Sequence, residues 1–469
     1  MKKNIWVMLL LVLYGVLKAQ NEWDTVWTKS YGGNDVDWAK SVAVDSNGYY
    51  VVVGFTRSFG AGREDLLVLR VDPQTGDTLW MRVYGDTLYD YAEGVAVDQN
   101  GYYVVVGSKN GPYTDVWVLK IDPQTGDTIW TRTYGGSSRD GAWGVAIDQY
   151  GYYIVVGYTS SYSITPDTPD VWILKIDPQT GDTLWTKTYG SDRYDEATAV
   201  AIDRDNYYIV SGELDATFAS PGFPWVLKIS PQTGDTVWTF SYILRDGPVE
   251  DIAVDSNDNY VALAHSYYYP YDIIVIKLNS QTGGEIWTKY YDIDSLYQYG
   301  YGVAVNREGN YIVAGTHGIN PSGVLILKID YQTGDTLWKA IYGMERDGGA
   351  RDITIDRNGY YVISGSAESL SDTVYDDVWI LKLYGLTTEV QEMTGSRRIK
   401  NDFYLPTLSG GVIRMGSEGK GVRFDIFSVN GRKINTIKNT RNFYYRINGA
   451  SGIYLIKTGK YNKKMIVIK

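Results

Sequence analysis

Cysteine is absent from this chain of 469 residues, and histidine occurs only twice. The lack of cysteine excludes disulfides, thiol catalysis, Cys-ligated zinc and iron–sulfur clusters. No nucleophile-elbow motif accompanies the two histidines, His265 and His317, to mark a Ser-His-Asp triad. We interpret both as surface loop residues.

Long hydrophobic runs are also missing, except at the N-terminus. Lys2 and Lys3 precede an apolar stretch from Ile5 to Leu17, and Ala19 offers a cleavage point. The stretch is shorter than the roughly 20 residues that span a bilayer. We therefore predict a secretory signal peptide at residues 1–19 and no transmembrane segment after its removal, with an uncleaved anchor as the alternative.

Positive charge is scarce outside the C-terminal end. The chain has a net charge of −11, yet Met393 to Lys469 holds 16 Lys and Arg against 3 Asp and Glu. The rest is therefore strongly acidic and would repel phosphates, so we expect no nucleic-acid partner. The uneven split predicts two domains with different partners.

What the sequence has in excess is Gly (51), Tyr (43) and a repeated phrase. Asp-Thr-Leu-Trp and its variants recur seven times, with the tryptophans at Trp27, Trp80, Trp130, Trp185, Trp238, Trp287 and Trp338. A period near 50 residues built of short strands is typical of a β-propeller.

Each repeat contains four strand signals, for example residues 145–148, 152–157, 171–177 and 183–189. The first three signals occur seven times, but the chain leaves the last repeat without a fourth strand. Residues 24–31 at the other end supply the missing one. The sequence thus predicts an all-β, seven-bladed β-propeller over residues 24–383, closed by its N-terminal strand, which removes open sheet edges.

The repeat text resembles known propeller families. Tyr-Gly-Gly at residues 31–33 and 134–136 resembles bacterial surface propeller repeats of the SBBP and delta-60 kind, and Thr-Gly-Asp-Thr-Leu-Trp is similar to quinoprotein-like repeats. Quinoprotein propellers generally have eight blades and often a vicinal cysteine pair, whereas this chain shows seven blades and no cysteine. We therefore interpret the tryptophans as inter-blade packing and expect no cofactor.

The C-terminal text differs from the repeat. Residues 424–434 read as a hairpin turning on Asn-Gly, followed by segments at 451–456 and 463–469. This order is similar to the C-terminal sorting domain (type A) of type IX secretion substrates, although the family's opening Pro-Asn-Pro is absent. The resemblance implies a small β-sandwich at residues 402–469 after a linker at 384–401. Its motif residues would be Gly431, Gly452, Tyr454, Lys463 and Lys464.

The sorting domain would bind the secretion machinery of the outer membrane, so that the protein is secreted or attached to the outer cell surface. An ordinary accessory β-domain is the alternative interpretation.

Aspartates recur just before the first strand of the repeat, at Asp37, Asp90, Asp140, Asp195, Asp246 and Asp347. Such a ring of carboxylates suits Ca²⁺. Capping of Asx turns explains the same pattern without a metal.

The loops between the second and third strands vary most, and they carry aromatic residues: Phe59, Tyr113, Tyr162, Phe218, Phe223, Tyr267, Tyr268, Tyr269 and Tyr271. Function usually lies on variable loops over a rigid scaffold. Tyrosine combines a flat apolar ring with a polar tip, which suits sugars and peptides. The alternative is that these loops vary because they bind nothing.

From these features we predict an exported, non-enzymatic propeller for surface adhesion or for recognition of a glycan or protein ligand. Two alternatives remain open at this point. One is a secreted enzyme that acts on polysaccharides, whose paired carboxylates the sequence does not single out. The other is a passive structural surface protein.

Overall fold

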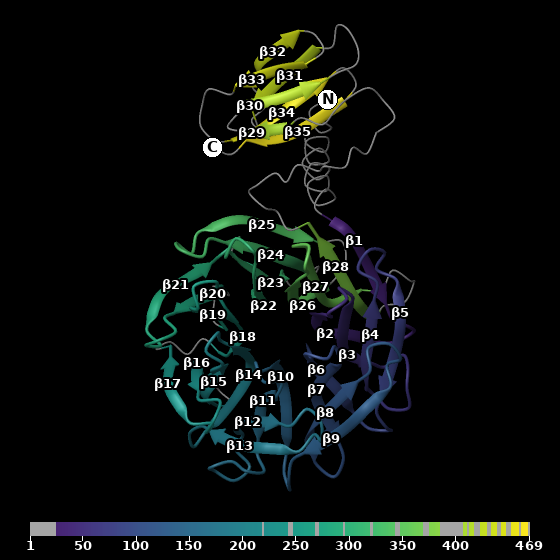
Figure 1. The fold of residues 1–469 in the computed structure, drawn as a ribbon, viewed down its shortest axis with the longest axis vertical. Helices are drawn as coiled ribbons and strands as arrows, with labels where there is room; N and C mark the ends of the chain where they lie inside the picture. Colours follow the sequence, from purple (N-terminus) through teal and green to yellow (C-terminus); the bar gives the residue numbers. More distant parts are fainter. Residues whose placement is uncertain are drawn as a thin grey trace, which may run out of the picture. The chain divides into compact units, whose positions relative to one another are not determined.

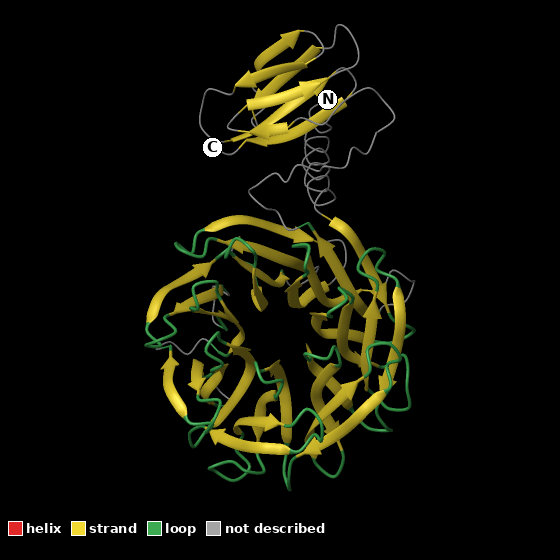
Figure 2. Cartoon of the chain, in the orientation of Figure 1, coloured by secondary structure: helices red, strands yellow, loops and turns green. Residues whose placement is uncertain are grey.

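The computed structural model describes residues 25–217, 220–242, 247–267, 272–293, 296–318, 322–342, 348–368 and 375–384, together with strands β29 to β35 nearer the C-terminus. All regular elements within these ranges are strands (Figure 2). Contacts divide the chain into two compact units, residues 1–385 and 386–469. The predicted signal peptide, residues 1–19, and residues 385–401 of the predicted linker lie outside the described residues.

The first unit is a seven-bladed β-propeller, as predicted (Figure 1). Its blades are four-stranded antiparallel sheets with these bounds: blade 1, β2 (Asp37–Val44), β3 (Tyr50–Thr56), β4 (Asp65–Val71) and β5 (Thr78–Tyr84); blade 2, β6 (Asp90–Val97), β7 (Tyr103–Asn110), β8 (Thr114–Ile121) and β9 (Thr128–Tyr134); blade 3, β10 (Asp140–Ile147), β11 (Tyr153–Thr159), β12 (Asp170–Ile176) and β13 (Thr183–Tyr189); blade 4, β14 (Tyr194–Ile202), β15 (Tyr208–Ala216), β16 (Phe223–Ile229) and β17 (Thr236–Ser241). The others are blade 5, β18 (Val249–Val254), β19 (Tyr260–His265), β20 (Ile273–Leu278) and β21 (Glu285–Tyr291); blade 6, β22 (Gln298–Val305), β23 (Tyr311–His317), β24 (Gly323–Ile329) and β25 (Thr336–Tyr342); and blade 7, β26 (Gly348–Ile355), β27 (Tyr361–Glu368), β28 (Asp376–Leu383) and β1 (Thr25–Tyr31).

The N-terminal strand closes the ring, which confirms the expectation from the strand count. β1 pairs antiparallel with β28, with Tyr31 opposite Val378 and Lys29 opposite Ile380. The sheet order β1-β28-β27-β26 gives blade 7 the same four strands as the other blades.

The second and third strands of each blade form the core. Every residue of β4 and of β12 is buried, because both faces of a blade pack against neighbouring blades. One core cluster joins Val53 and Leu66 of blade 1 to Tyr103 and Leu119 of blade 2. Burial on both faces explains why these strands lack the apolar–polar alternation of a one-sided sheet.

Local chemistry fixes the hairpins. In the turn after β8, the Asp122 carboxylate accepts hydrogen bonds from the backbone amides of Gln124 (2.8 Å) and Thr125 (3.0 Å). Gly126 has φ +76°, which favours glycine, and its amide donates to the Asp122 carbonyl (2.9 Å). The turn text therefore specifies the hairpin, as predicted.

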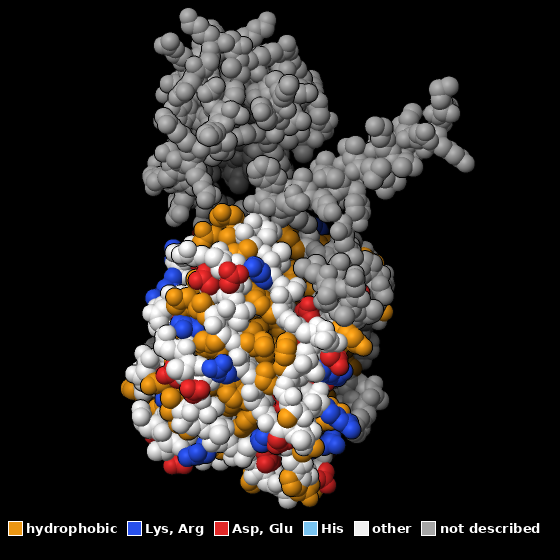
Figure 3. Space-filling view, turned by 90° about the vertical axis from the view of Figure 1, so that its right-hand side faces the viewer, with side chains coloured by type: hydrophobic (Ala, Val, Ile, Leu, Met, Phe, Trp, Pro, Cys, Tyr) orange, Lys and Arg blue, Asp and Glu red, His pale blue; other side chains and the backbone are white. Residues whose placement is uncertain are grey.

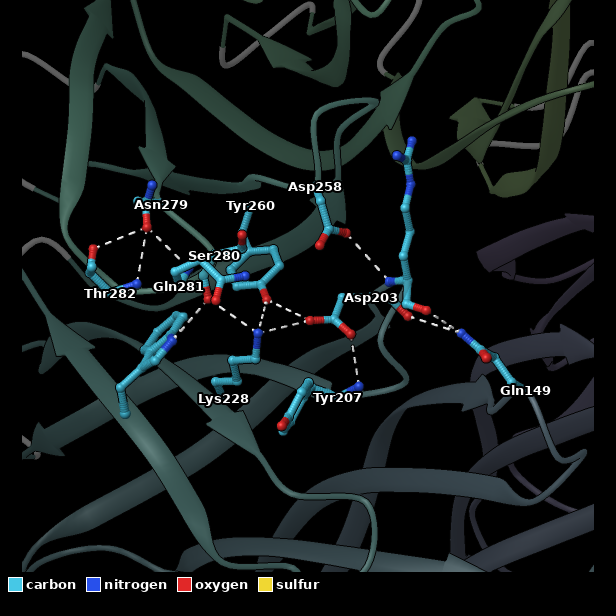
Figure 4. A network of polar contacts seen from close by, with 12 residues as sticks. Gln149, Asp203, Tyr207, Lys228, Asp258, Tyr260, Asn279, Ser280, Gln281 and Thr282 are labelled. Atoms are coloured by element: carbon cyan, nitrogen blue, oxygen red, sulfur yellow. Dashed lines mark hydrogen bonds and ion pairs between the residues drawn. The ribbon is translucent and has the colours of Figure 1, made fainter.

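Adjacent blades are joined by a buried polar contact that we call the inter-blade latch (Figure 4). Asp203 follows the first strand of blade 4, Lys228 lies on the third strand of that blade, and Tyr260 begins the second strand of blade 5. Lys228 Nζ is 2.9 Å from Asp203 Oδ2, and the Tyr260 hydroxyl donates to the same oxygen at 2.7 Å. The same three roles recur in Asp45–Arg70–Tyr103, Asp98–Lys120–Tyr153, Asp148–Lys175–Tyr208, Asp255–Lys277–Tyr311 and Asp356–Lys382–Tyr50.

Blade 6 builds its latch differently. Asn306 replaces the aspartate, and Glu308 supplies the carboxylate, 2.7 Å from Lys328 Nζ. The Asn306 amide lies 3.5 Å from the Tyr361 hydroxyl of blade 7. The latch carboxylate of blade 6 therefore lies two positions later in the sequence than in the other blades, and it still pairs with the buried Lys328.

The repeated tryptophans pack between blades, as predicted. Trp238 of blade 4 lies against Tyr260 of blade 5, with ring centres 5.8 Å apart, and its indole NH donates to the Ser280 carbonyl at 3.2 Å. Trp27 of the closing strand makes the same ring contact with Tyr50, at 6.1 Å. Closure of the ring thus reuses the contact that joins the other blades.

The outer rim has a mixed surface. On the side of the ring on which β5 lies, basic and acidic side chains are interspersed with apolar ones, and no patch of one charge dominates that view (Figure 3). The strong negative charge of the propeller sequence is therefore not gathered on this face.

The second unit contains two sheets. β30 (Val412–Gly416) pairs with β29 (Thr407–Ser409) and β33 (Asn442–Arg446); the second sheet has the order β32 (Lys433–Lys438), β31 (Arg423–Ser428), β34 (Gly452–Thr458), β35 (Tyr461–Val467). Gly452 and Tyr454 lie in β34, and Lys463 and Lys464 lie in β35; Gly431 is outside the described residues. The predicted β-sandwich and its sorting role stay predictions.

Candidate functional site around the propeller axis

The first strands of the seven blades surround the axis of the ring (Figure 1), and each carries a β-bulge at the same position. In blade 1, for example, the pairing with β3 shifts between Ala39 and Ser41, which leaves Lys40 in the bulge. The seven bulge residues, which we call the bulge ring, are Lys40, Glu93, Trp143, Thr198, Glu250, Tyr301 and Arg351. A bulge re-aims a side chain relative to its strand, and bulges are common beside functional sites.

The residues of the bulge ring vary from blade to blade. Its seven residues are of six types, with glutamate in two blades, whereas the rest of the strand reads Val-Ala-Val or a close variant in most blades. The sequence interpretation missed this set because it searched the variable loops. Alignment of the seven first strands would have shown that the bulge position varies widely before a strand end that repeats.

Side chains of the bulge ring interact across blades. Lys40 Nζ lies 3.1 Å from Glu93 Oε2, and this pair is partly open to solvent. The Arg351 guanidinium lies over the Tyr301 ring at 4.4 Å and over the Trp38 ring at 5.5 Å, which holds the cation between two aromatic faces.

A hollow of about 500 Å³ opens beside Arg351, between blades 6, 7 and 1. Its lining is mainly aromatic and small polar: Trp38, Tyr297, Tyr299, Tyr301, Thr316, Gly318, Ser322, Gly348, Gly349, Arg351, Ser366 and Asp376. Tyr299 lies 6.4 Å from both Tyr297 and Tyr301 between ring centres. The Trp38 indole NH donates to Asp376 Oδ2 at 3.1 Å, which fixes the indole at the edge of the hollow.

Carboxyl groups around the axis are held partly in the neutral form. Burial raises the pKa of Glu250 to about 8, and the nearby Glu196 raises it further. Burial likewise raises the pKa of Asp251 to about 8, with Asp352 as the second cause. Since a raised pKa means a neutral acid near pH 7, the axis carries less negative charge than the sequence suggests.

His265 joins this group, and its assignment as a surface loop residue was wrong. It is the last residue of β19 and only 2% exposed, and His317 ends β23 at 1% exposed. His265 Nδ1 lies 3.6 Å from Glu250 Oε1, and its ring contacts Tyr299 at 4.8 Å. Burial lowers the pKa of His265 to about 4, so the imidazole is neutral at pH 7.

The loop aromatics are not brought together by the fold. Phe59, Tyr113, Tyr162, Phe223 and Tyr267 belong to five different blades, and Phe218, Tyr268, Tyr269 and Tyr271 lie outside the described residues. Tyr113 is 50% exposed. The Tyr162 hydroxyl donates to the Gly135 carbonyl at 2.7 Å.

Among the loop aromatics that the structure describes, Tyr267 contacts His265. Its ring centre lies 5.0 Å from that of His265. The predicted tyrosine loop therefore meets the candidate site at one residue.

The recurring aspartates serve their own blade junctions. Asp37, Asp90, Asp140 and Asp195 are fully buried, and Asp246 and Asp347 lie outside the described residues. Asp140, for example, accepts hydrogen bonds from the Gly136 amide (3.0 Å) and the Ser161 hydroxyl (2.6 Å), which is the capping alternative. In the part of the chain that the structure describes, no three His, Cys, Asp or Glu side chains converge as a metal site. The ring of Ca²⁺ ligands stays a prediction.

A second hollow of about 680 Å³ lies among the turns that follow the first strands. It is lined by Val97, Gln99, Ile147, Asp148, Gln149, Ile202, Asp203, Arg204, Val254, Asp255, Ser256 and Val305. These residues come from repeated positions, and three of them, Asp148, Asp203 and Asp255, belong to latches. We therefore place the candidate site at the bulge ring.

Comparisons with known proteins give a family. No curated protein matches the sequence, and none of the described residues forms a helix that could cross a membrane. Among solved structures, the chain is similar to one described as the extracellular domain of a one component system from B. thetaiotaomicron (12% identity, TM-score 0.44), covering 94% of this chain and 60% of that one. It is also similar to the periplasmic gluconolactonase PpgL of Pseudomonas aeruginosa (12% identity, TM-score 0.48), covering 72% of this chain and 97% of that one.

The repeat family is shown by sequence. The profile of the PQQ_2 family, described as outer membrane protein assembly factor BamB, matches residues 169–414, which is more than half of the chain. This match agrees with the quinoprotein-like character of the repeat text. The chain therefore belongs to the PQQ_2 family of propeller repeat proteins.

Proposed function

We propose that this propeller is an exported, non-enzymatic recognition module that binds carbohydrate at the bulge ring. The observation that carries the proposal is the hollow beside Arg351, where Trp38, Tyr299 and Tyr301 supply aromatic faces at the bulge ring. Aromatic faces with a few polar groups suit sugar rings, which combine apolar C–H surfaces with hydroxyls.

The size of the hollow favours a small ligand or the end of a chain. About 500 Å³ lies within the range of small-molecule sites. A specific protein partner would need about 800 Å² of contact surface instead. Glu250 belongs to the bulge ring, and its neutral carboxyl can donate as well as accept hydrogen bonds, which suits hydroxyl groups.

Delivery to the cell surface is the second half of the proposal. The basic C-terminal unit would bind the secretion machinery of the outer membrane through a type IX-like sorting domain that includes Gly431, Gly452, Tyr454, Lys463 and Lys464. The sequence order of these motifs and the predicted signal peptide support it. The mature propeller would then be secreted or attached to the outer surface, without a cofactor.

An enzyme that acts on polysaccharides is the second candidate. The observation that favours it is Glu250, whose pKa is raised to about 8 by burial and which lies 3.6 Å from His265. Strongly perturbed titratable groups beside a hollow are frequent at catalytic sites. The test is turnover of a glycan by the wild type. If Glu250→Gln abolished that turnover but retained glycan binding, the protein would be an enzyme and not a recognition module.

The direct test is binding of the whole protein to a glycan array, followed by titration of the best ligand. Trp38→Ala should weaken binding at least tenfold because it removes an aromatic face from the hollow, a loss of about 1.4 kcal/mol or more. Tyr113→Ala removes an exposed loop aromatic of blade 2 and should leave affinity unchanged. An array without any saturable ligand would support a passive surface protein. If both variants weakened ligand binding equally, the variable loops would be the binding site instead of the bulge ring.

A further inference from the structure

Two buried carboxylates from neighbouring blades face each other at the junction of blades 3 and 4. Asp170 begins the third strand of blade 3, Asp195 lies in the first strand of blade 4, and both are 0% exposed. A Cβ placed on Gly190, between them in sequence, would lie 2.6 Å from Asp170 Oδ1 and 2.6 Å from Asp195 Oδ2. The two oxygens therefore converge on one point beside this glycine.

One of these oxygens has no partner. Asp170 Oδ2 accepts from the Ile164 amide at 2.6 Å, but Asp170 Oδ1 is buried and makes no hydrogen bond within the described residues. The oxygens of Asp195 accept from the amides of Ser191 (2.5 Å) and Asp215 (2.6 Å).

No positive side chain neutralises the pair. Neither Asp170 nor Asp195 forms an ion pair with any residue whose placement is described, and the nearby Arg193 is paired with Asp215 at 3.3 Å. Two buried like charges without a counter-ion are strongly unfavourable.

The junction of blades 2 and 3 repeats the arrangement. A Cβ on Gly135 would overlap Asp115 Oδ1 and lie 2.8 Å from Asp140 Oδ2, and Asp115 Oδ1 is again buried without a hydrogen-bond partner. Burial and the neighbouring Asp140 raise the pKa of Asp115. The arrangement is therefore a repeated feature of the fold.

The junction of blades 1 and 2 shows what a cation does there. Asp65 and Asp90 face Gly85 in the same way, and Asp65 Oδ1 is likewise buried without a hydrogen-bond partner. Here Lys109 lies 3.0 Å from Asp86 Oδ2 and 3.8 Å from Asp90 Oδ2. In blade 3 the position of Lys109 is held by Thr159, which donates a hydrogen bond but brings no charge.

We propose that the carboxylate pairs Asp170–Asp195 and Asp115–Asp140 each bind one Ca²⁺ ion between blades, where Lys109 serves as the built-in cation of the preceding junction. Ca²⁺ takes six to eight oxygen ligands in a flexible geometry, so main-chain carbonyls and water would complete each site. Each ion would join two blades at the opposite end of the strands from the latches, as Asp170 and the latch residue Lys175 show at the two ends of β12.

Calcium binding by the whole protein tests the proposal. After removal of metals with chelator, isothermal titration calorimetry with CaCl₂ at pH 7.5 should show at least two equivalents, with Kd about 10⁻⁴–10⁻³ M as in extracellular modules. Asp170→Asn should remove one equivalent. The matched change Asp65→Asn, at the junction that contains Lys109, should leave the number unchanged.

Thermal unfolding separates a ligand from a merely structural residue. Asp170→Asn removes a repelled charge, so its Tm in chelator should equal or exceed that of the wild type, whereas in 5 mM CaCl₂ the wild type should be the more stable. Lys109→Thr should add one Ca²⁺ equivalent. The proposal is overturned if the wild type binds no Ca²⁺, if Asp170→Asn binds as many ions as the wild type, or if Mg²⁺ binds equally well.

Discussion

The inter-blade latch and the bulge ring each occur once in every blade, and they differ in how far their residues are repeated from blade to blade. The inter-blade latch keeps its chemistry in all seven blades, and blade 6 still pairs Lys328 when its aspartate is replaced. The bulge ring, a few residues earlier on the same strands, has six kinds of side chain at its seven positions. A repeat scaffold thus preserves what holds neighbouring units together and varies what faces the axis.

Energetics explain the difference. A latch residue is buried, so removal of one partner leaves an uncompensated charge in the protein interior. A bulge-ring residue contacts the axis, where water can replace a lost partner at smaller cost. The first set therefore tolerates few changes, and the second is free to be specialised for a ligand.

The largest effect should come from breaking one latch. Lys228→Ala should lower the free energy of unfolding by about 3–5 kcal/mol, because Asp203 is left buried and charged. Urea unfolding would measure this loss. Lys29→Ala, which breaks an exposed pair with Asp77, should cost no more than about 1 kcal/mol. Similar losses in the two variants would contradict the structural role of the latch.

A smaller effect should follow from the exceptional latch of blade 6. Glu308→Gln should cost about 1–3 kcal/mol, since the buried ammonium of Lys328 loses this carboxylate. Adding Asn306→Asp should restore the loss by recreating the arrangement of the other blades. Urea unfolding of the single and double variants checks this, and a double variant no more stable than the single one would show that the two arrangements are not equivalent.

The smallest effect, about 1 kcal/mol between pH 7 and pH 8, should come from Glu250. Its pKa is raised to about 8 in the folded protein, against about 4.3 unfolded, so the folded state binds the extra proton in this interval. Stability should therefore fall as pH rises, and Glu250→Gln should flatten that fall. Unfolding at both pH values measures the slope, which Glu285→Gln, on the exposed start of β21, should leave as in the wild type. If the dependence of stability on pH were unchanged in Glu250→Gln, the pKa of Glu250 would not be raised in the folded protein.

Local text was enough to predict the scaffold. The spacing of the tryptophans predicted seven blades, the Asp-Pro-Gln-Thr-Gly-Asp turn predicted the hairpins, and the count of fourth strands predicted closure by residues 24–31, where the structure has β1 at Thr25–Tyr31. Each of these depends on neighbours in sequence or on the repeat itself, so a single sequence carries it.

The candidate site was not predicted, because it depends on contacts between blades. Arg351 lies between Trp38 and Tyr301, and these three residues come from three different blades. His265 looked like a loop residue because its strand ends there, and only packing of the neighbouring blade shows it to be buried. The partner of Asp195 is Asp170, which no periodic pattern in the first strands reveals.

The pairing of β1 with β28 also has a consequence for the life of the chain. These are the first and last strands of the propeller to be synthesised, so the earliest strand waits for a partner until the entire repeat has been made. Contacts between such distant segments form slowly. A chain cut short before β28, or clipped at its N-terminus, keeps two unpaired edges that are exposed to proteases and to aggregation. Only a chain that contains both β1 and β28 can close the ring and cover these two edges.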